Sequence, residues 1–122
     1  MAFSGFTLTG ATSKTVEIFD LANAGAGWGT PITGGPTPPL YPRMFLLPNG
    51  KVFFTGNGEG SSANAWLFDP TARAWTSSAP TTADRTYGSA VIFPLLPPLY
   101  TPQVMNFGGG SPIGSGHLRS MG

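Results

Sequence analysis

The sequence contains no cysteine, so disulfide bonds, thiolate metal sites and cysteine nucleophiles are all excluded. It contains one histidine, His117, in the segment Ser115-Gly-His-Leu118. A single histidine can act as a base or as one ligand of a metal, but no partner ligand lies near it in the sequence. We therefore expect His117 to be an exposed residue of a C-terminal tail.

Charged residues are scarce, at 9% of the chain with a net charge of +1. The six basic residues are scattered, whereas a nucleic-acid surface needs clustered Lys and Arg to neutralise phosphates. The longest apolar stretch, residues 90–100, is interrupted by prolines and is shorter than the roughly 18 residues that span a bilayer. We therefore expect no nucleic acid and no membrane as a partner. The first residues, Met1-Ala-Phe-Ser4, lack the basic and apolar regions of a signal peptide.

Glycine and proline are abundant, with 18 and 13 residues respectively among 122. Such a composition is close to that of low-complexity chains, but 40% hydrophobic and 12% aromatic residues argue for a packed core. The glycines and prolines stand between short apolar runs, where turns are expected. The sequence therefore predicts a folded, all-β protein.

Four landmarks recur in the same order at a spacing near fifty residues. Apolar runs that end in glycine occupy Met1–Gly5, Val52–Gly56 and Val104–Gly108. An aromatic-Asp pair follows the first two, at Phe19-Asp20 and Phe68-Asp69. A tryptophan then follows each pair, and a Leu-Leu-Pro or Ile-Phe-Pro segment precedes each of the last two glycine-ended runs. A repeat of this length, with a strand, an aromatic-Asp corner and a tryptophan, is typical of a kelch-type β-propeller blade.

The repeat divides the chain into the end of one blade at 1–35, a complete blade at 40–80 and the start of a third at 85–112. Residues 113–122 are expected to form an irregular tail. We expect each blade to be a four-stranded antiparallel sheet, so the fold is a partial propeller. Since propellers close with about four to eight blades, the chain is expected to be a piece of a larger protein.

Several local structures follow from the pattern. Thr15–Asp20 alternates as a half-buried strand, and Asn23–Gly29 is expected to be a glycine-rich turn. Tyr41–Leu47 and Lys51–Thr55 are expected to pair through Asn49-Gly50, a sequence that favours a two-residue type I′ turn. Two further strands, at 65–68 and 74–76, complete this blade. A longer loop is expected to join the strands of the third blade, 86–94 and 103–107.

The segment Tyr41-Pro-Arg-Met-Phe-Leu-Leu-Pro-Asn-Gly-Lys-Val-Phe-Phe-Thr-Gly56 resembles the kelch-like propeller of the galactose oxidase and glyoxal oxidase group. Arg85–Pro94, continuing into Val104–Gly109, is similar to the following blade of that group. The resemblance covers roughly residues 1–112. It implies a secreted seven-bladed protein, and therefore an extracellular or periplasmic location.

Active members of this group carry one copper ion, ligated by two tyrosines and two histidines, and a tyrosyl radical cross-linked to a cysteine. They oxidise an alcohol or aldehyde with O₂ and release hydrogen peroxide. The cysteine and the histidine pair have no counterpart here. Arg85-Thr86-Tyr87 has the form of the motif that carries the radical tyrosine in galactose oxidase. In the alignment with glyoxal oxidase, by contrast, Tyr87 is structural. The longer signature, Tyr41–Gly56, favours the alignment with glyoxal oxidase. Phe45 occupies a strand in which some relatives have His, and it cannot ligate a metal.

Other candidate side chains have structural interpretations. Trp28 and Trp75 could stack on sugar rings, as could Trp66, but the first two share a repeat position, which favours packing between blades. Asp20 and Asp69 also share a repeat position, which favours a turn-forming role. Glu59 is expected in a loop that could face a groove. The glycine-rich segment 56–60 lacks the following helix and the Gly-Lys-Ser/Thr of a phosphate loop, so it is expected to be a turn.

We therefore predict that this chain supplies scaffold, with no catalytic, metal-binding or cofactor-binding residue of its own. Its partners would be the remaining blades of the parent chain, and the parent could be a copper oxidase acting on carbohydrate alcohols or aldehydes. The alternative is a non-catalytic kelch-type propeller that binds a glycan or a protein. Terminal blades that lack neighbours should leave apolar faces uncovered, so the isolated chain is expected to self-associate, to aggregate or to fold only in part.

Overall fold

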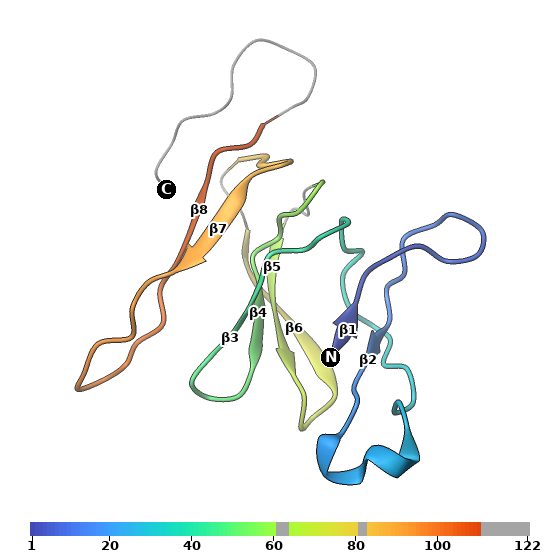
Figure 1. Ribbon diagram of the computed structural model, residues 1–122. Helices are drawn as coiled ribbons and strands as arrows, with labels where there is room; N and C mark the ends of the chain where they lie inside the picture. The colour runs from blue at the N-terminus through green and yellow to red at the C-terminus, as the bar shows by residue number, and fades with distance from the viewer. Residues whose placement is uncertain (61–63, 81–82, 111–122) are drawn as a thin grey trace.

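The computed structural model describes residues 1–60, 64–80 and 83–110, so His117 and the tail at 113–122 lie outside the described residues. Three antiparallel sheets follow one another along the chain (Figure 1). The prediction of a mostly β, antiparallel protein is confirmed. In the described part of the chain, no helix is long and apolar enough to cross a membrane.

The strands group into a first, a central and a third sheet. The first sheet pairs β1 with β2, the central sheet has the order β3-β4-β5-β6, and the third pairs β7 with β8. The bounds are β1 Ala2–Phe3, β2 Val16–Glu17, β3 Met44–Leu46, β4 Val52–Phe54, β5 Asn64–Asp69, β6 Ala74–Pro80, β7 Ser89–Ile92 and β8 Val104–Phe107.

The central sheet has the four antiparallel strands that the sequence predicts, and their bounds differ most at β6 and β3. β6 continues to Pro80, well beyond the predicted end. β3 begins at Met44 and not at Tyr41, because Tyr41 has a φ of 50° and cannot belong to an extended strand. Between the pairs Asn64–Pro80 and Trp66–Ser77, two steps along β5 oppose three along β6, so the register shift marks a bulge in β6.

The turn between β3 and β4 differs from the predicted two-residue turn. Leu47 N–H donates to the Lys51 carbonyl at 2.9 Å, and Gly50 N–H donates to the Leu47 carbonyl at 2.9 Å. Gly50 has a φ of 80°, whereas Asn49 has no positive φ. The loop is therefore the three residues 48–50, a type I turn closed by a left-handed glycine. Pro48 explains the difference, since its fixed φ suits the first central position of a type I turn.

The predicted glycine-rich turn at 23–29 is instead largely 3₁₀-helical: η1, Leu21–Ala26, consists of two short turns joined by a kink at Asn23, which has a φ of −132° and a ψ of 50°. Asp20 Oδ1 accepts a hydrogen bond from Ala22 N–H at 2.9 Å and so caps its first turn. Gly27, with a φ of 72°, ends the helix. Such a short helix needs no apolar periodicity, which is why the sequence pattern did not reveal it.

The main core lies between the first and central sheets. Val16 and Phe68 are fully buried, and Ile32 is nearly so. Phe3 and Trp75 pack against this cluster, with their ring centroids 4.9 Å apart. Burying each large apolar side chain contributes on the order of 1.5–3 kcal/mol, so this core holds the two sheets together.

A second, more polar junction joins the central and third sheets. Tyr87 N–H donates to the Gly58 carbonyl at 2.9 Å, and Arg43 Nε donates to the Gly88 carbonyl at 3.3 Å. Leu47 and Val104 line a pocket of 200 Å³ between these sheets. The three sheets thus pack in series, each against the next in the chain.

Candidate functional site

The three glycine-ended runs turn at the same end of their sheets, the upper end in Figure 1. Gly5, Gly56 and Gly108 follow β1, β4 and β8, and all have positive φ, at 104°, 85° and 66°. Tyr41 and Tyr87, which lead into β3 and β7 at this end, have φ values of 50° and 60°. The repeat therefore extends to backbone conformation, because residues at corresponding positions share unusual dihedral angles.

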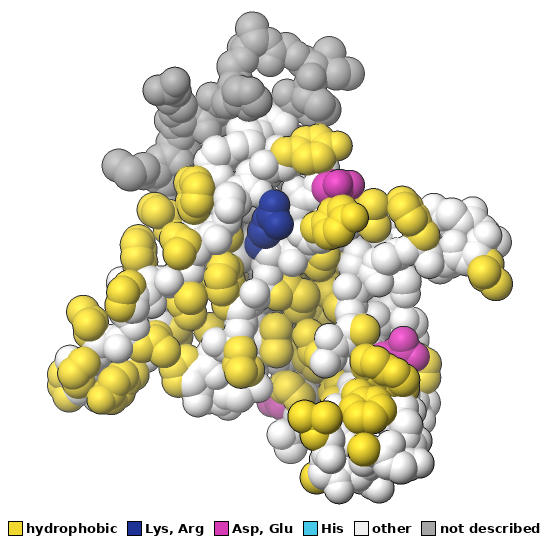
Figure 2. Space-filling view, viewed as in Figure 1, with side chains coloured by type: hydrophobic (Ala, Val, Ile, Leu, Met, Phe, Trp, Pro, Cys, Tyr) yellow, Lys and Arg dark blue, Asp and Glu magenta, His cyan; other side chains and the backbone are white. Residues whose placement is uncertain are grey.

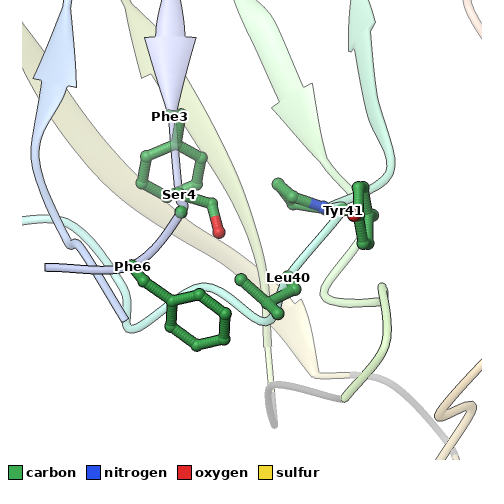
Figure 3. Close-up of a pocket in the computed structure, with 7 residues that line it drawn as sticks. Phe3, Ser4, Phe6, Leu40 and Tyr41 are labelled. Carbon is green, nitrogen blue, oxygen red and sulfur yellow. The ribbon is translucent and has the colours of Figure 1, made fainter. Parts of the chain in front are cut away.

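One pocket, of 360 Å³, opens at this upper end between the first and central sheets. Phe3 of β1 and Phe6 beyond its end line one side of the pocket, and Leu40 and Tyr41, from the segment before β3, line the other (Figure 3). Ser4 Oγ donates to the Pro39 carbonyl at 2.8 Å and so links the two segments. The lining is mainly apolar and contains no carboxylate, imidazole or amine, so it can bind an apolar group.

A larger pocket, of 530 Å³, lies between η1 and the β5–β6 turn. The Trp28 ring, 54% exposed, packs edge-on against Phe19 with a centroid distance of 5.5 Å. Asn23 and Arg73 bring polar groups to the same pocket. Arg73 Nη2 donates to the Thr30 carbonyl at 2.7 Å, which fixes the guanidinium beside the aromatic surface. An aromatic face with amide and guanidinium groups around it can bind a polar ring.

Tyr87 lies in a closely packed turn. Its side chain is 64% exposed, whereas the neighbouring Arg85 is 4% exposed and donates from Nη1 to the Gly108 carbonyl at 3.2 Å. A Cβ built on Gly88 or on Gly109 would lie 2.7 or 2.6 Å from the Arg85 carbonyl oxygen. These glycines permit the close approach of the two segments. In the described part of the chain, no three His, Cys, Asp or Glu residues gather to hold a metal.

The other candidates are distributed as follows. Trp75 packs between Phe68 and Phe3, in agreement with the packing role predicted for it. Asp69 Oδ1 accepts from the Thr71 and Ala72 amides at 2.9 and 3.0 Å, so its predicted turn-forming role is confirmed, as is that of Asp20. Phe45 lies on β3, opposite Phe53 of β4. Glu59 is exposed, and its amide donates to the Leu40 carbonyl.

The sequence interpretation missed the buried polar groups at the central–third junction. Thr55 and Asn57 are fully buried, and Asn106 Nδ2 donates to the Thr55 carbonyl at 3.5 Å. The Asn57 side-chain amide has no hydrogen-bond partner among the described residues. Thr55 and Asn57 directly follow β4, and Asn106 lies within β8. No motif in the sequence marks these three residues as buried.

No protein-family model matches the sequence, and no curated protein matches it.

Proposed function

We propose that the chain forms consecutive blades of a kelch-type β-propeller similar to the galactose oxidase and glyoxal oxidase group, and that it acts there as scaffold. The observation that carries the proposal is a repeated aromatic pair. Phe19 and Trp28 are antiparallel partners with centroids 5.5 Å apart, and Phe68 and Trp75 are antiparallel partners with centroids 5.0 Å apart. Two successive sheets that carry equivalent aromatic pairs fit a blade repeat.

The resemblance supports a parent that is secreted and possesses copper, but the groups for that chemistry would come from the remaining blades. This chain has no cysteine to cross-link a tyrosine and one histidine where two would be needed. Tyr87, the one residue that matches a radical-tyrosine motif, lies in the packed turn around Arg85. The proposed role of the chain is therefore to support a site that other blades complete.

Copper binding tests this proposal. The isolated chain should take up no stoichiometric Cu(II) in calorimetry and release no peroxide from galactose or methylglyoxal. Tyr87→Phe should leave both results unchanged. A stoichiometric copper site of sub-micromolar affinity that is lost in Tyr87→Phe would overturn the scaffold assignment.

A second candidate function is non-catalytic glycan binding, and the pocket beside Trp28 favours it. Exposed indole faces stack on the apolar faces of sugar rings, and Asn23 and Arg73 supply hydrogen-bond donors at the pocket. Titration with a panel of neutral mono- and oligosaccharides, followed by tryptophan fluorescence, tests this function. Trp28→Ala should abolish any response, whereas Phe6→Ala, in the upper pocket, should not change it. Absence of a response from the wild-type chain would exclude this candidate for the sugars used.

A further inference from the structure

Polar side chains are buried where the central and third sheets meet. Apolar side chains cover much of the face shown in Figure 2 and few charges separate them, yet Thr55 and Asn57 are fully buried and Arg85 is 4% exposed. Neither Nδ2 nor Oδ1 of Asn57 has a hydrogen-bond partner among the described residues, and Asn106 Oδ1 has none there either. Native proteins rarely leave buried polar atoms unpaired, so these three atoms point to a bound group.

The two asparagines come from different sheets and flank one residue. Asn106 lies on β8 of the third sheet, and its Nδ2 donates to the Thr55 carbonyl at 3.5 Å. Asn57 follows β4 of the central sheet, and its backbone N–H donates to the Thr55 hydroxyl at 3.3 Å. Both asparagines therefore contact Thr55, but their side chains do not pair with each other. A small group bound between them would join the two sheets.

The repeat shows how this junction differs from the one between the first and central sheets. Counted from the glycine that ends each apolar run, Asn106 corresponds to Phe54 and to Phe3. Phe3 and Phe54 pack edge-on, with ring centroids 6.2 Å apart. The third sheet thus brings an amide to a position where the other two sheets bring aromatic rings. Because asparagine is smaller than phenylalanine, this position can hold a small polar molecule beside the side chain.

The chemistry of the three atoms favours water. The Asn57 amide presents a donor and an acceptor whichever way the group is turned, whereas Asn106 Oδ1 is an acceptor because Nδ2 is fixed on Thr55. A cation would leave Asn57 Nδ2 unpaired, and an anion would leave both oxygens unpaired. The Arg85 guanidinium, which donates to the Gly108 carbonyl at 3.2 Å in the same junction, also disfavours a cation. Water both donates and accepts, so it can pair with both kinds of atom.

We propose that this junction holds an internal water molecule that pairs with the Asn57 amide and donates to Asn106 Oδ1. Buried waters typically make about three hydrogen bonds to groups that the protein itself leaves unpaired. The water is then part of the contact between the central and third sheets, beside the direct hydrogen bond from Tyr87 N–H to the Gly58 carbonyl. The site depends on this contact and does not require the parent chain to be an oxidase.

Water-selective NMR of the ¹⁵N-labelled protein tests the site directly. The side-chain amide protons of Asn57 should show NOE and ROE contacts of opposite sign to water, which indicates a water molecule bound for longer than the protein takes to tumble. The amide of Asn49, on the exposed β3–β4 turn, is the matched control and should show only short-lived hydration. Thr55→Val removes a hydroxyl whose exchanging proton would imitate water, and should leave the Asn57 signal in place. An Asn57 amide without a long-lived water contact would overturn the proposal.

Two leucine variants separate a bridging water from an amide that has no ligand. With the water in place, Asn57→Leu and Asn106→Leu should each lower the melting temperature by roughly 3–10 °C, because each removes one partner of the water. Asn106→Leu should also abolish the long-lived water contact of Asn57. The double variant should recover part of the loss, since it removes both ends of the bridge.

The opposite result is expected if Asn57 is unpaired. Asn57→Leu would then remove a buried polar group at no loss of a hydrogen bond, and its melting temperature would rise above that of the wild type. Such a rise would overturn the water site. The NMR result on the wild-type protein decides the question if a variant does not fold.

Discussion

At the scale of single residues, Gly35 shows how closely the segment between the first and central sheets packs on Trp75 of β6. A Cβ at this position would lie 2.5 Å from Trp75 Nε1 and 2.7 Å from Cδ1. No real Cβ makes such a contact, so Trp75 would have to leave its place between Phe3 and Phe68. The requirement is for space, since Gly35 does not have a positive φ.

We predict that Gly35→Ala lowers the free energy of unfolding by about 1–3 kcal/mol, the usual cost of overfilling a packed site. Gly25→Ala is the matched control. Gly25 lies in the exposed η1 helix, has no positive φ and has nothing within 4 Å of a built Cβ. Urea unfolding followed by tryptophan fluorescence measures both variants. Equal stability of Gly35→Ala and wild type would show that the indole is not fixed against this segment.

Asp69 gives the second prediction at this scale. The Ala72 amide, more than the Thr71 amide and the Lys51 ammonium 3.6 Å away, holds the pKa of Asp69 below its ordinary value of 3.8. Since the pKa is lowered on folding, the stabilisation is present above the ordinary value and is lost as the pH falls through the folded value. An NMR titration should find the pKa of Asp69 below 3.8. Lys51→Met should reverse only a small part of the shift, and a complete reversal would mean that the ion pair dominates.

At the scale of elements, the β3–β4 hairpin tests the revised turn. Only Gly50 has a positive φ, so Gly50→Ala should cost about 1 kcal/mol. Pro48→Ala should lower the stability by a few tenths up to about 1 kcal/mol, because alanine gives the unfolded chain more conformational entropy than proline does. Asn49→Ala should lose little more than the hydrogen bond that Lys51 N–H donates to Asn49 Oδ1 at 3.0 Å. Thermal unfolding ranks the three variants. If Asn49→Ala destabilises the protein more than Gly50→Ala does, the result would favour the two-residue turn predicted from the sequence.

The elements also show what a sequence can predict. Alternation, turn residues and the fifty-residue spacing predicted the central sheet, the long β7–β8 loop and the equivalence of Asp20 and Asp69, because these depend on local chemistry that repeats. The η1 helix was missed because a capped 3₁₀ turn needs only Asp20 and a following glycine. The late start of β3 was missed because Tyr41 has a left-handed φ in a segment whose carbonyls lie against Gly58, a contact that local propensity does not encode.

The candidate sites depend still more on tertiary structure. The pocket beside Trp28 brings together η1 and the β5–β6 turn, which are more than forty residues apart in the sequence. The buried Asn57 and Arg85 lie in segments whose composition is that of surface loops. Only the contact between sheets makes these residues neighbours, so composition and spacing could not place them.

At the scale of the whole molecule, the series of sheets depends on the contact between Phe3 of the first sheet and Trp75 of the central sheet. Their centroids are 4.9 Å apart and their planes are inclined by 40°. Aromatic pairs of this kind contribute about 0.5–1.5 kcal/mol beyond the area that they bury. If the sheets unfold as one unit, the energy of the Phe3–Trp75 contact contributes to the free energy of unfolding of the whole chain.

A double-mutant cycle with Phe3→Leu and Trp75→Leu should therefore give a coupling energy of about 0.5–1.5 kcal/mol in urea unfolding. Phe6→Leu combined with Trp75→Leu is the control, because Phe6 is 68% exposed and lies in the upper pocket. Its coupling should be close to zero. All variants are compared at one protein concentration, so that any association contributes equally. If the Phe3–Trp75 coupling is also zero, the first sheet does not pack on the central sheet in solution. The first sheet would then not cover Phe68 and Trp75 of the central sheet, and the packing of the sheets in series would have no basis.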